Sequence, residues 1–233
     1  MAGGYWRIAS GLLLVPAAVA GLSSCSNGPS TATASMAKAS SDGGLTAAQL
    51  RAALLTRVNG VAAVAPASSG KYSSLTAANT SKNGANAVQV TPKTCAGATA
   101  GFNPTALAAS PAAAVTFKVG SNGVSEVLIA SSAKAASAAL AGHIPAECAK
   151  YQAKVGGKTY TYSATEQKVT GIGQQAQVLN VQAVGAKSND LWSLIYRGKG
   201  FVGTVTVVGP NASKEAVTEL GKQAYAYAVK TLS

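Results

Sequence analysis

Residues 191–208, with the sequence LWSLIYRGKGFVGTVTVV, decide the fold of this chain. Two runs rich in β-branched and aromatic residues, 191–197 and 201–208, flank a Gly-Lys-Gly segment. Such residues favour β-strands, and a short link that contains glycine favours a hairpin. The stretch therefore predicts two antiparallel strands joined by a tight turn.

Further hairpin signals lie on the N-terminal side of this stretch. Gly156-Gly157 is a strong two-residue turn signal, and the sequence GSNG at 120–123 is a second turn between apolar runs. These signals predict two further hairpins, one with strands at 115–119 and 124–130 and one with strands at 154–155 and 158–163. One more strand is predicted at 175–184, just before the opening stretch.

Helix signals precede, interrupt and follow the strands. Thr46 and Gln49 form a capping-box pattern, and an apolar stripe follows that Asn59-Gly60 would end. The stripe consists of Leu50, Leu54, Leu55 and Val58. Three more helical pieces are predicted: from Ser131 or Ser132 to Ala141, from Pro145 through Cys148 and Tyr151, and from Ser213 to Thr231, the last with Val217, Leu220, Ala224, Tyr227 and Ala228 on one face.

Between the first helix and the first hairpin, residues 61–111 are rich in Ala, Ser, Asn, Gly and Pro. Long loops are expected there, with one short strand at 87–90. Short turns between strands, with helices between and after them, indicate an α+β fold. We expect residues 45–233 to form a single domain, an antiparallel β-sheet with helices packed on one side.

The N-terminus has the layout of a lipoprotein export signal. Arg7 precedes a charge-free apolar run at 8–20, and Leu22-Ser23-Ser24-Cys25 resembles a bacterial lipobox. Residues 1–24 are thus interpreted as a signal peptide, and 25–44 as an acylated N-terminus with a flexible tether. The apolar run is shorter than the roughly 20 residues of a membrane span. A non-lipid export signal cut elsewhere is the other interpretation.

The remaining cysteines follow from this assignment. Once Cys25 carries a lipid, Cys95 and Cys148 are an even pair in an oxidising compartment, which predicts a disulfide between them. A pair of buried thiols and a metal site are the alternatives. Two cysteines and one histidine are a poor ligand set for a metal, so no metal site is expected.

The chain is strongly basic, with 19 Lys and Arg against 7 Asp and Glu and a net charge of +12. An exported protein seldom meets nucleic acid, so that partner is not expected. One interpretation is attraction to an anionic membrane or wall surface. The other is that lysines spread along the chain keep an alanine-rich surface hydrated.

The order of elements resembles that of actinobacterial exported lipoproteins related to the extracellular sensor domain of mycobacterial PknH-type kinases. The resemblance covers roughly 45–233 and rests on Cys25, the capped first helix, the positions of Cys95 and Cys148, and the segment GIGQQA at 171–176. It implies an envelope domain with a groove between sheet and helices that binds a small ligand. A PsbP-like fold, used by other mycobacterial lipoproteins, is the alternative topology.

This chain departs from that pattern in two ways. It has one predicted disulfide where the kinase sensor has two, and it shows no kinase or transmembrane segment. The resemblance therefore implies that any signalling would pass through a partner.

The residues offer little for catalysis, and neither an enzyme nor a cofactor is expected. His143 is the single histidine and follows a predicted helix end, where an imidazole has a structural role. No Gly-x-Ser-x-Gly pattern and no close pair of acids outside the last helix are present. Gly171-Ile172-Gly173 lacks the context of a phosphate-binding loop and is interpreted as a bend that enters a strand.

A binding surface is the stronger hypothesis. Trp192, Leu194 and Tyr196 share one face of their strand, and Tyr160 and Tyr162 share one face of theirs. If these faces meet, the aromatic rings form either core or the wall of a groove. Basic residues at hairpin ends would rim this groove for an anionic ligand: Lys158, Arg197 and Lys199.

These observations favour a non-enzymatic binding or sensor-like lipoprotein on the extracytoplasmic face of the cell membrane. It would hold a small or lipid-like ligand, or an envelope protein, in a groove. The alternative is a structural or adaptor lipoprotein that binds wall polymer or a protein without a pocket. An envelope hydrolase is the third and weakest hypothesis.

Overall fold

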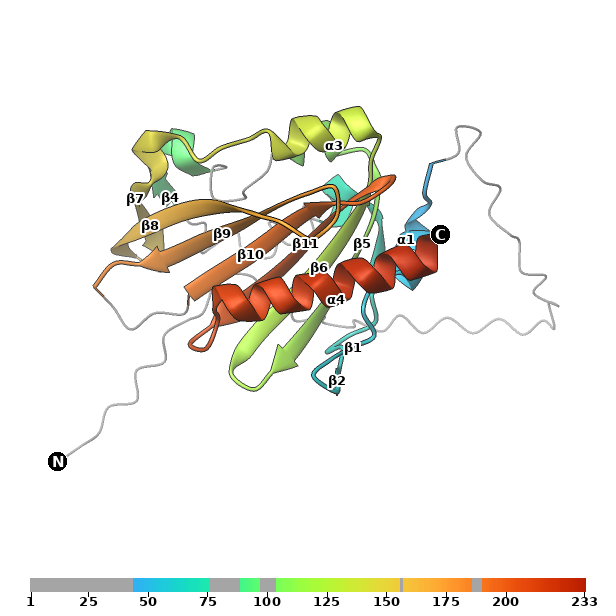
Figure 1. Ribbon diagram of the computed structural model, residues 1–233. Helices are drawn as coiled ribbons and strands as arrows, with labels where there is room; N and C mark the ends of the chain where they lie inside the picture. Colours follow the sequence, from blue (N-terminus) through green and yellow to red (C-terminus); the bar gives the residue numbers. More distant parts are fainter. Residues whose placement is uncertain (1–43, 76–88, 97–103, 156, 186–189) are drawn as a thin grey trace, which may run out of the picture.

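The computed structural model describes residues 44–75, 89–96, 104–155, 157–185 and 190–233 (Figure 1). Its helices are α1 (Ala47–Ala52), α3 (Ala133–Leu140) and α4 (Lys214–Leu232), with 3-10 turns η2 (Lys93–Ala96), η4 (Pro104–Leu107) and η5 (Ala146–Cys148). Its strands are β1 (Arg57–Val58), β2 (Val61–Ala62), β3 (Ser68–Lys71), β4 (Gln89–Thr91), β5 (Pro111–Val119), β6 (Asn122–Ala130), β7 (Lys150–Val155), β8 (Lys158–Val169), β9 (Gln175–Ala183), β10 (Asp190–Arg197) and β11 (Phe201–Gly209). No helix among these residues is long and apolar enough to cross a membrane.

The domain is built on a nine-stranded antiparallel sheet in the order β3-β5-β6-β11-β10-β9-β8-β7-β4. The opening stretch of sequence forms β10 and β11, which pair from Asp190 with Gly209 to Arg197 with Val202. They lie in the middle of the sheet, because β6 pairs with the far side of β11 and β9 with the far side of β10. The α+β class and the hairpin at 191–208 are therefore confirmed.

Alternation along the strands gives the sheet two faces with different covers. Leu128, Leu194 and Phe201 point to the face that α1 and α4 cover, here called the α4 face. Their neighbours Ile129, Ile195 and Val202 point to the other face, here called the α3 face. The prediction that helices pack on one side of the sheet is correct for α1 and α4, whereas α3 packs on the opposite side.

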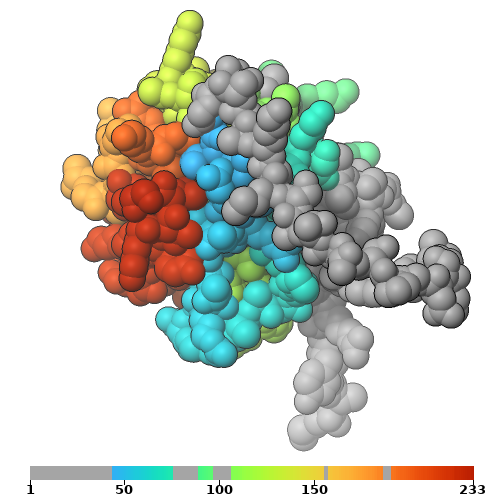
Figure 2. Space-filling view, turned by 90° about the vertical axis from the view of Figure 1, so that its right-hand side faces the viewer, coloured from blue at the N-terminus to red at the C-terminus, as the bar shows by residue number. Residues whose placement is uncertain are grey.

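On the α4 face, α1 and α4 bury the largest cluster of side chains. Figure 2 shows α1 lying beside α4, with the β1–β2 segment next to it. Leu50 of α1 and Leu54, which follows this helix, belong to the cluster. Helix α4 contributes Val217, Leu220 and Ala224. The predicted apolar face of the last helix is therefore confirmed, except that Tyr227 is half-exposed.

Helix starts follow the predicted caps. Thr46 accepts a hydrogen bond from the Gln49 amide while the Gln49 side chain accepts one from the Thr46 amide, so the capping box is formed. Ser132 and Ser213 cap α3 and α4 with one hydrogen bond each, which their side-chain oxygens accept from the backbone amides of Ala135 and Ala216. These side chains satisfy amides that have no partner inside the helix.

The first helix is shorter than expected. It ends at Ala52, and Asn59-Gly60 forms the turn between β1 and β2 instead of a helix end. Both turn residues have positive φ, 49° and 79°, as a tight hairpin turn requires. Asn-Gly is a signal for either structure, and here the hairpin is formed.

Other boundaries also differ from the expectations. Tyr151 lies in β7, since η5 ends at Cys148. The described parts of 61–111 include β3, which pairs with the N-terminal half of β5, and β4, which confirms a short strand near the position predicted. The bend at 171–173 is confirmed, with Ile172 buried between two glycines of positive φ.

The predicted disulfide is present between Cys95 of η2 and Cys148 of η5, with Cα atoms 5.4 Å apart. Both cysteines are buried in a third cluster on the α3 face, with Tyr151, Leu179 and Val181. The bond therefore fixes η2 and η5 to each other over the β7–β9 part of the sheet. Cys25 and most of the predicted tether at 25–44 lie outside the described residues.

Candidate functional site: a groove beside the last helix

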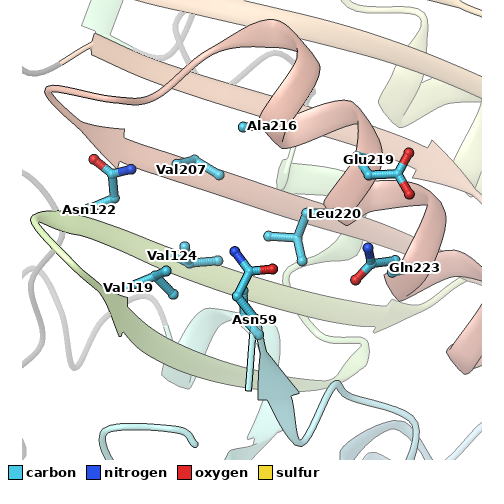
Figure 3. Close-up of a pocket in the computed structure, with 10 residues that line it drawn as sticks. Asn59, Val119, Asn122, Val124, Val207, Ala216, Glu219, Leu220 and Gln223 are labelled. Atoms are coloured by element: carbon cyan, nitrogen blue, oxygen red, sulfur yellow. The ribbon is translucent and has the colours of Figure 1, made fainter. Parts of the chain in front are cut away.

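A groove of about 190 Å³ opens on the α4 face, at the end of the sheet where the β5–β6 hairpin turns (Figure 3). Three parts of the chain line it: α4, the end of the β5–β6 hairpin with β11, and the β1–β2 hairpin. Its lining residues are Val58, Asn59, Val119, Asn122, Val124, Val207, Ala216, Glu219, Leu220 and Gln223.

The groove has an apolar floor and a polar rim. Val124 and Val207 are directly opposed across β6 and β11, and Leu220 lies over them from α4. Polar groups come from Asn59 on one side and from α4 on the other (Figure 3). A concave apolar surface with a few polar groups is typical of binding sites, although this one is smaller than a usual drug-sized pocket.

Local contacts hold the hairpin end of the groove in place. The Asn122 side-chain oxygen accepts a hydrogen bond of 3.2 Å from the Asn211 amide, in the turn between β11 and α4. The Asn211 side chain in turn donates to the Ser121 hydroxyl. The start of α4 and the β5–β6 turn are thus tied together, which fixes two sides of the groove.

A buried carboxyl group lies next to the groove floor. Glu126 points to the same face as Val124, two residues away on β6, and is 1 % exposed. Its Oε2 accepts a 2.8 Å hydrogen bond from the Leu55 amide, and its Oε1 has no partner among the described residues. Burial raises the pKa of Glu126 to about 7, and the bond from Leu55 opposes this rise.

The aromatic residues predicted to bind a ligand do not form one surface. Trp192 and Tyr196 lie on the α4 face, where Tyr196 is fully buried under α4. Tyr160 and Tyr162 share a face with Ala164, which pairs with Val181 on the α3 face. The sheet therefore separates the two sets, and the expected common aromatic wall does not form.

Each set has a packing role of its own. The Tyr196 ring meets Tyr225 edge-on at a centroid distance of 5.6 Å. Burial, followed by the nearby charges of Glu126 and Tyr225, raises the pKa of Tyr196 well above its usual value. On the other face, Tyr162 stacks on Tyr151 at 5.5 Å beside the disulfide cluster. Trp192 is half-buried against the α4-face core.

The basic residues predicted to rim that surface also lie apart. Arg197 is on the α3 face, where its guanidinium donates to the Ser137 hydroxyl of α3; in the described part of the chain its buried Nε has no partner. Lys199 is exposed in the β10–β11 turn, and Lys158 is exposed at the start of β8. None of the three lines the groove beside α4.

His143 is engaged in a structural contact. Its Nδ1 lies 2.7 Å from Glu166 Oε1, while Glu166 Oε2 accepts a hydrogen bond from the Ile144 amide. Glu166 therefore fastens the α3–η5 connection to β8. In the described part of the chain, no group of three or more His, Cys, Asp or Glu residues could hold a metal ion.

A second exposed surface lies on the α4 face beyond the reach of α4. On this side, β4 and β7, β8 up to Gln167, and Gln182 of β9 present uncharged polar or basic side chains that are exposed or half-exposed. This polar sheet surface comprises Gln89, Thr91, Lys150, Gln152, Lys154, Thr159, Thr161, Ser163, Thr165, Gln167 and Gln182. Lys214 of α4 donates to Gln167 at its border.

Sequence reasoning expected a groove between sheet and helices but missed the residues that line this one, and it missed the buried acid. The groove residues come from three distant segments, and no spacing within one segment reveals that they meet. For Glu126 a signal existed, because it alternates with Val124 and Leu128 on an apolar strand face. That pattern places a carboxyl group in the core.

Comparison with known proteins gives likeness at the level of the fold. No family model and no curated protein matches this chain. The crystal structure of the extracellular domain of PknH from Mycobacterium tuberculosis superposes with a TM-score of 0.51 at 15% identity, over 81% of this chain and 97% of that one. An uncharacterised protein of Mycobacterium smegmatis, an Rv0999 ortholog, gives a TM-score of 0.36 at 14% identity, over 73% and 85%. The described domain therefore has the fold of the PknH extracellular domain.

Proposed function

We propose that this chain is a non-enzymatic binding lipoprotein of the cell envelope, held at the extracytoplasmic face of the membrane by a lipid on Cys25. Its domain would hold an apolar part of a small or lipid-like ligand, or of an envelope protein, in the groove beside α4. The disulfide supports the oxidising location. The fold shared with an extracellular domain supports the same location.

The groove is the observation that carries this proposal. Between sheet and helices the α4 face is closely packed, with Leu50, Leu194 and Ala224 fully buried. Binding is therefore expected at the groove rather than deep between the layers. A volume of about 190 Å³ suits an apolar side chain or a short acyl segment, with the remainder of the ligand outside.

The described residues favour binding over catalysis. The single histidine is paired with Glu166, on the face opposite the groove. The two acids near the groove, Glu126 and Glu219, differ in kind, since the first is buried and the second is exposed. No nucleophile lies between them in the groove lining.

The test is native mass spectrometry of the protein purified from its own host under gentle conditions. A bound mass is expected on the wild type and is expected to be lost in Ala216→Phe, which fills the groove from an exposed position of α4. Ala226→Phe, at another exposed position of α4 outside the groove, is the matched control and should keep the mass. A wild type that is always ligand-free, or equal binding by both variants, would rule out the groove.

The lipid anchor has a separate test. The N-terminal peptide of the protein isolated from membranes should carry a diacylglyceryl group on Cys25, and Cys25→Ala should leave the membrane fraction. A wild-type protein cut elsewhere and found free of lipid would exclude the anchor.

One observation favours a second candidate, an adaptor that binds anionic wall polymer. The polar sheet surface offers hydroxyl and amide groups with Lys150 and Lys154, and its members carry no carboxylate. Exchanging both lysines for glutamate should reduce sedimentation with isolated cell walls at low salt. The same exchange at Lys118 and Lys134, which are exposed elsewhere, should have a smaller effect. Equal losses would indicate net charge alone.

A further inference from the structure

The buried Glu126 is connected to the groove through the backbone of one wall. Leu55, whose amide donates to Glu126 Oε2, lies between the end of α1 and the start of β1. Three and four residues further on, Val58 and Asn59 line the groove. The carboxyl group thus adds a hydrogen bond to the buried side chains of Leu54 and Val58 that hold the segment 53–60 against the sheet.

The surroundings of this carboxyl group are almost entirely apolar. Val115 of β5 and Val205 of β11 are its cross-strand neighbours. The titratable group that interacts with it is Tyr196 of β10, whose buried hydroxyl has no partner among the described residues, and Tyr225 of α4 lies beyond Tyr196.

Cationic groups do not compensate this acid. Arg51 of α1 and Arg57 of β1 are exposed, and neither of the ion pairs found among the described residues involves Glu126. A carboxylate that is buried without a cation is rare, because the charged form loses its hydration.

We propose that Glu126 is a pH-responsive latch that fastens the wall segment 53–60 over the groove when protonated and releases it when ionised. The biological role of this latch rests on the proposed function, because the groove is the site that Glu126 would regulate. The pH response itself does not depend on a ligand.

The direction of the switch follows from the two protonation states. The neutral carboxyl remains buried and still accepts the hydrogen bond from Leu55 through its carbonyl oxygen. Within the described residues the carboxylate has a single N–H partner, and the raised pKa indicates that this bond does not replace its lost hydration. Lifting the 53–60 segment would admit water to the charged group, so rising pH favours the open wall.

Hydrogen–deuterium exchange of the full chain tests this latch without any ligand. After correction for the intrinsic exchange rate, the equilibrium constant for opening of 53–60 should increase by up to about tenfold per pH unit between about pH 5 and 7. Above that range it should level off. Glu126→Gln, which retains an acceptor for Leu55, should abolish this pH dependence. Glu147→Gln removes an exposed acid on η5 and should leave it unchanged.

Two results would overturn the latch: a 53–60 segment whose exchange is independent of pH in the wild type, or a pH dependence that persists in Glu126→Gln. If that variant does not fold, the infrared band of protonated carboxyl groups in glutamate-labelled wild type replaces it. The band should be present at about pH 6 and lost by about pH 8. Its absence at about pH 6 would also overturn the proposal.

The outcomes for the groove and the latch are separable. A pH-dependent segment in a protein that never carries a ligand supports the latch and contradicts the proposed function. A ligand lost in Ala216→Phe, with a wall segment that does not respond to pH, supports the function and contradicts the latch.

Discussion

At the scale of single residues, Tyr196 combines tight packing with an unsatisfied polar atom. Its ring is fully buried between Phe201 and Tyr225, with which it makes edge-on contacts. Its hydroxyl is buried and has no partner among the described residues. The ring therefore stabilises the core, whereas the hydroxyl has lost water without gaining a hydrogen bond.

Tyr196→Phe is accordingly expected to be neutral or to raise the free energy of unfolding by about 1 kcal/mol. Urea unfolding at a pH below neutrality measures the change. Tyr160→Phe is the control, since that side chain is half-exposed and should change little. A loss of stability at position 196 alone would mean that the hydroxyl has a partner, such as a buried water.

The buried carboxyl group of Glu126 should make the stability of the fold depend on pH. Its folded pKa of about 7 exceeds the value of 4.5 that applies when it is exposed, so folding favours its protonated form. Its contribution is then fully present below about pH 4.5 and is lost as pH rises to about 7, a change of about 3 kcal/mol. Denaturant unfolding at several pH values should show this decline in the wild type and not in Glu126→Gln. Parallel curves for the two proteins would refute it.

At the scale of elements, Gly203 leaves space for the Tyr196 ring against the central strands. A Cβ atom at Gly203 of β11 would overlap the Tyr196 ring, which lies across it from β10. Gly203→Ala should therefore destabilise the fold by about 1–3 kcal/mol, through overpacking. Gly70→Ala in β3, where a Cβ meets nothing within 4 Å, is the control and should have little effect. Thermal unfolding that is equal for both variants would contradict the close approach.

Local signals predicted most of these elements. The cap at Thr46, the helix start at Ser213 and the hairpin at 191–208 depend on residues close in sequence, and each formed as expected. Asn59-Gly60 was ambiguous because positive φ suits both a helix end and a hairpin turn. The α3 face was missed since alternation reveals that a strand has two faces but not which helix covers each.

The site was harder to predict for the same reason. Tyr162 and Tyr196 each show a clear alternation, yet whether their faces coincide depends on the register of β8, β9 and β10. One residue of shift in a strand exchanges its faces. The groove beside α4 depends on the packing of three separate segments, which no local pattern encodes.

At the scale of the whole molecule, the disulfide cluster stabilises the β7–β9 part of the sheet, which α4 covers only in part. The bond closes a separation of 53 residues, for which the chain-entropy estimate is about 4 kcal/mol. Replacing Cys95 and Cys148 together by alanine should lower the free energy of unfolding by roughly this amount, as measured by chemical denaturation. Thiol alkylation of the folded wild type without reductant should label neither cysteine. Labelling of both would show that the bond is not formed.

The two candidate surfaces lie over different parts of the same face of the sheet. The groove lies where α4, β1 and the β5–β6 hairpin meet, and the polar sheet surface extends over β4, β7 and β8. Their tests are therefore independent, because a substitution in one surface leaves the other intact.

Among the described residues, the sheet also ends in two very short strands, four residues in β3 and three in β4. A long exposed edge strand can pair with a strand of a neighbouring copy, whereas a short edge strand offers few unpaired backbone groups for such pairing. Lys71 ends the first of these strands, and Pro92, which has no amide hydrogen, follows the second. Crowded together on a surface, copies of this domain would thus resist edge-to-edge polymerisation and remain separate units, each with its own groove available.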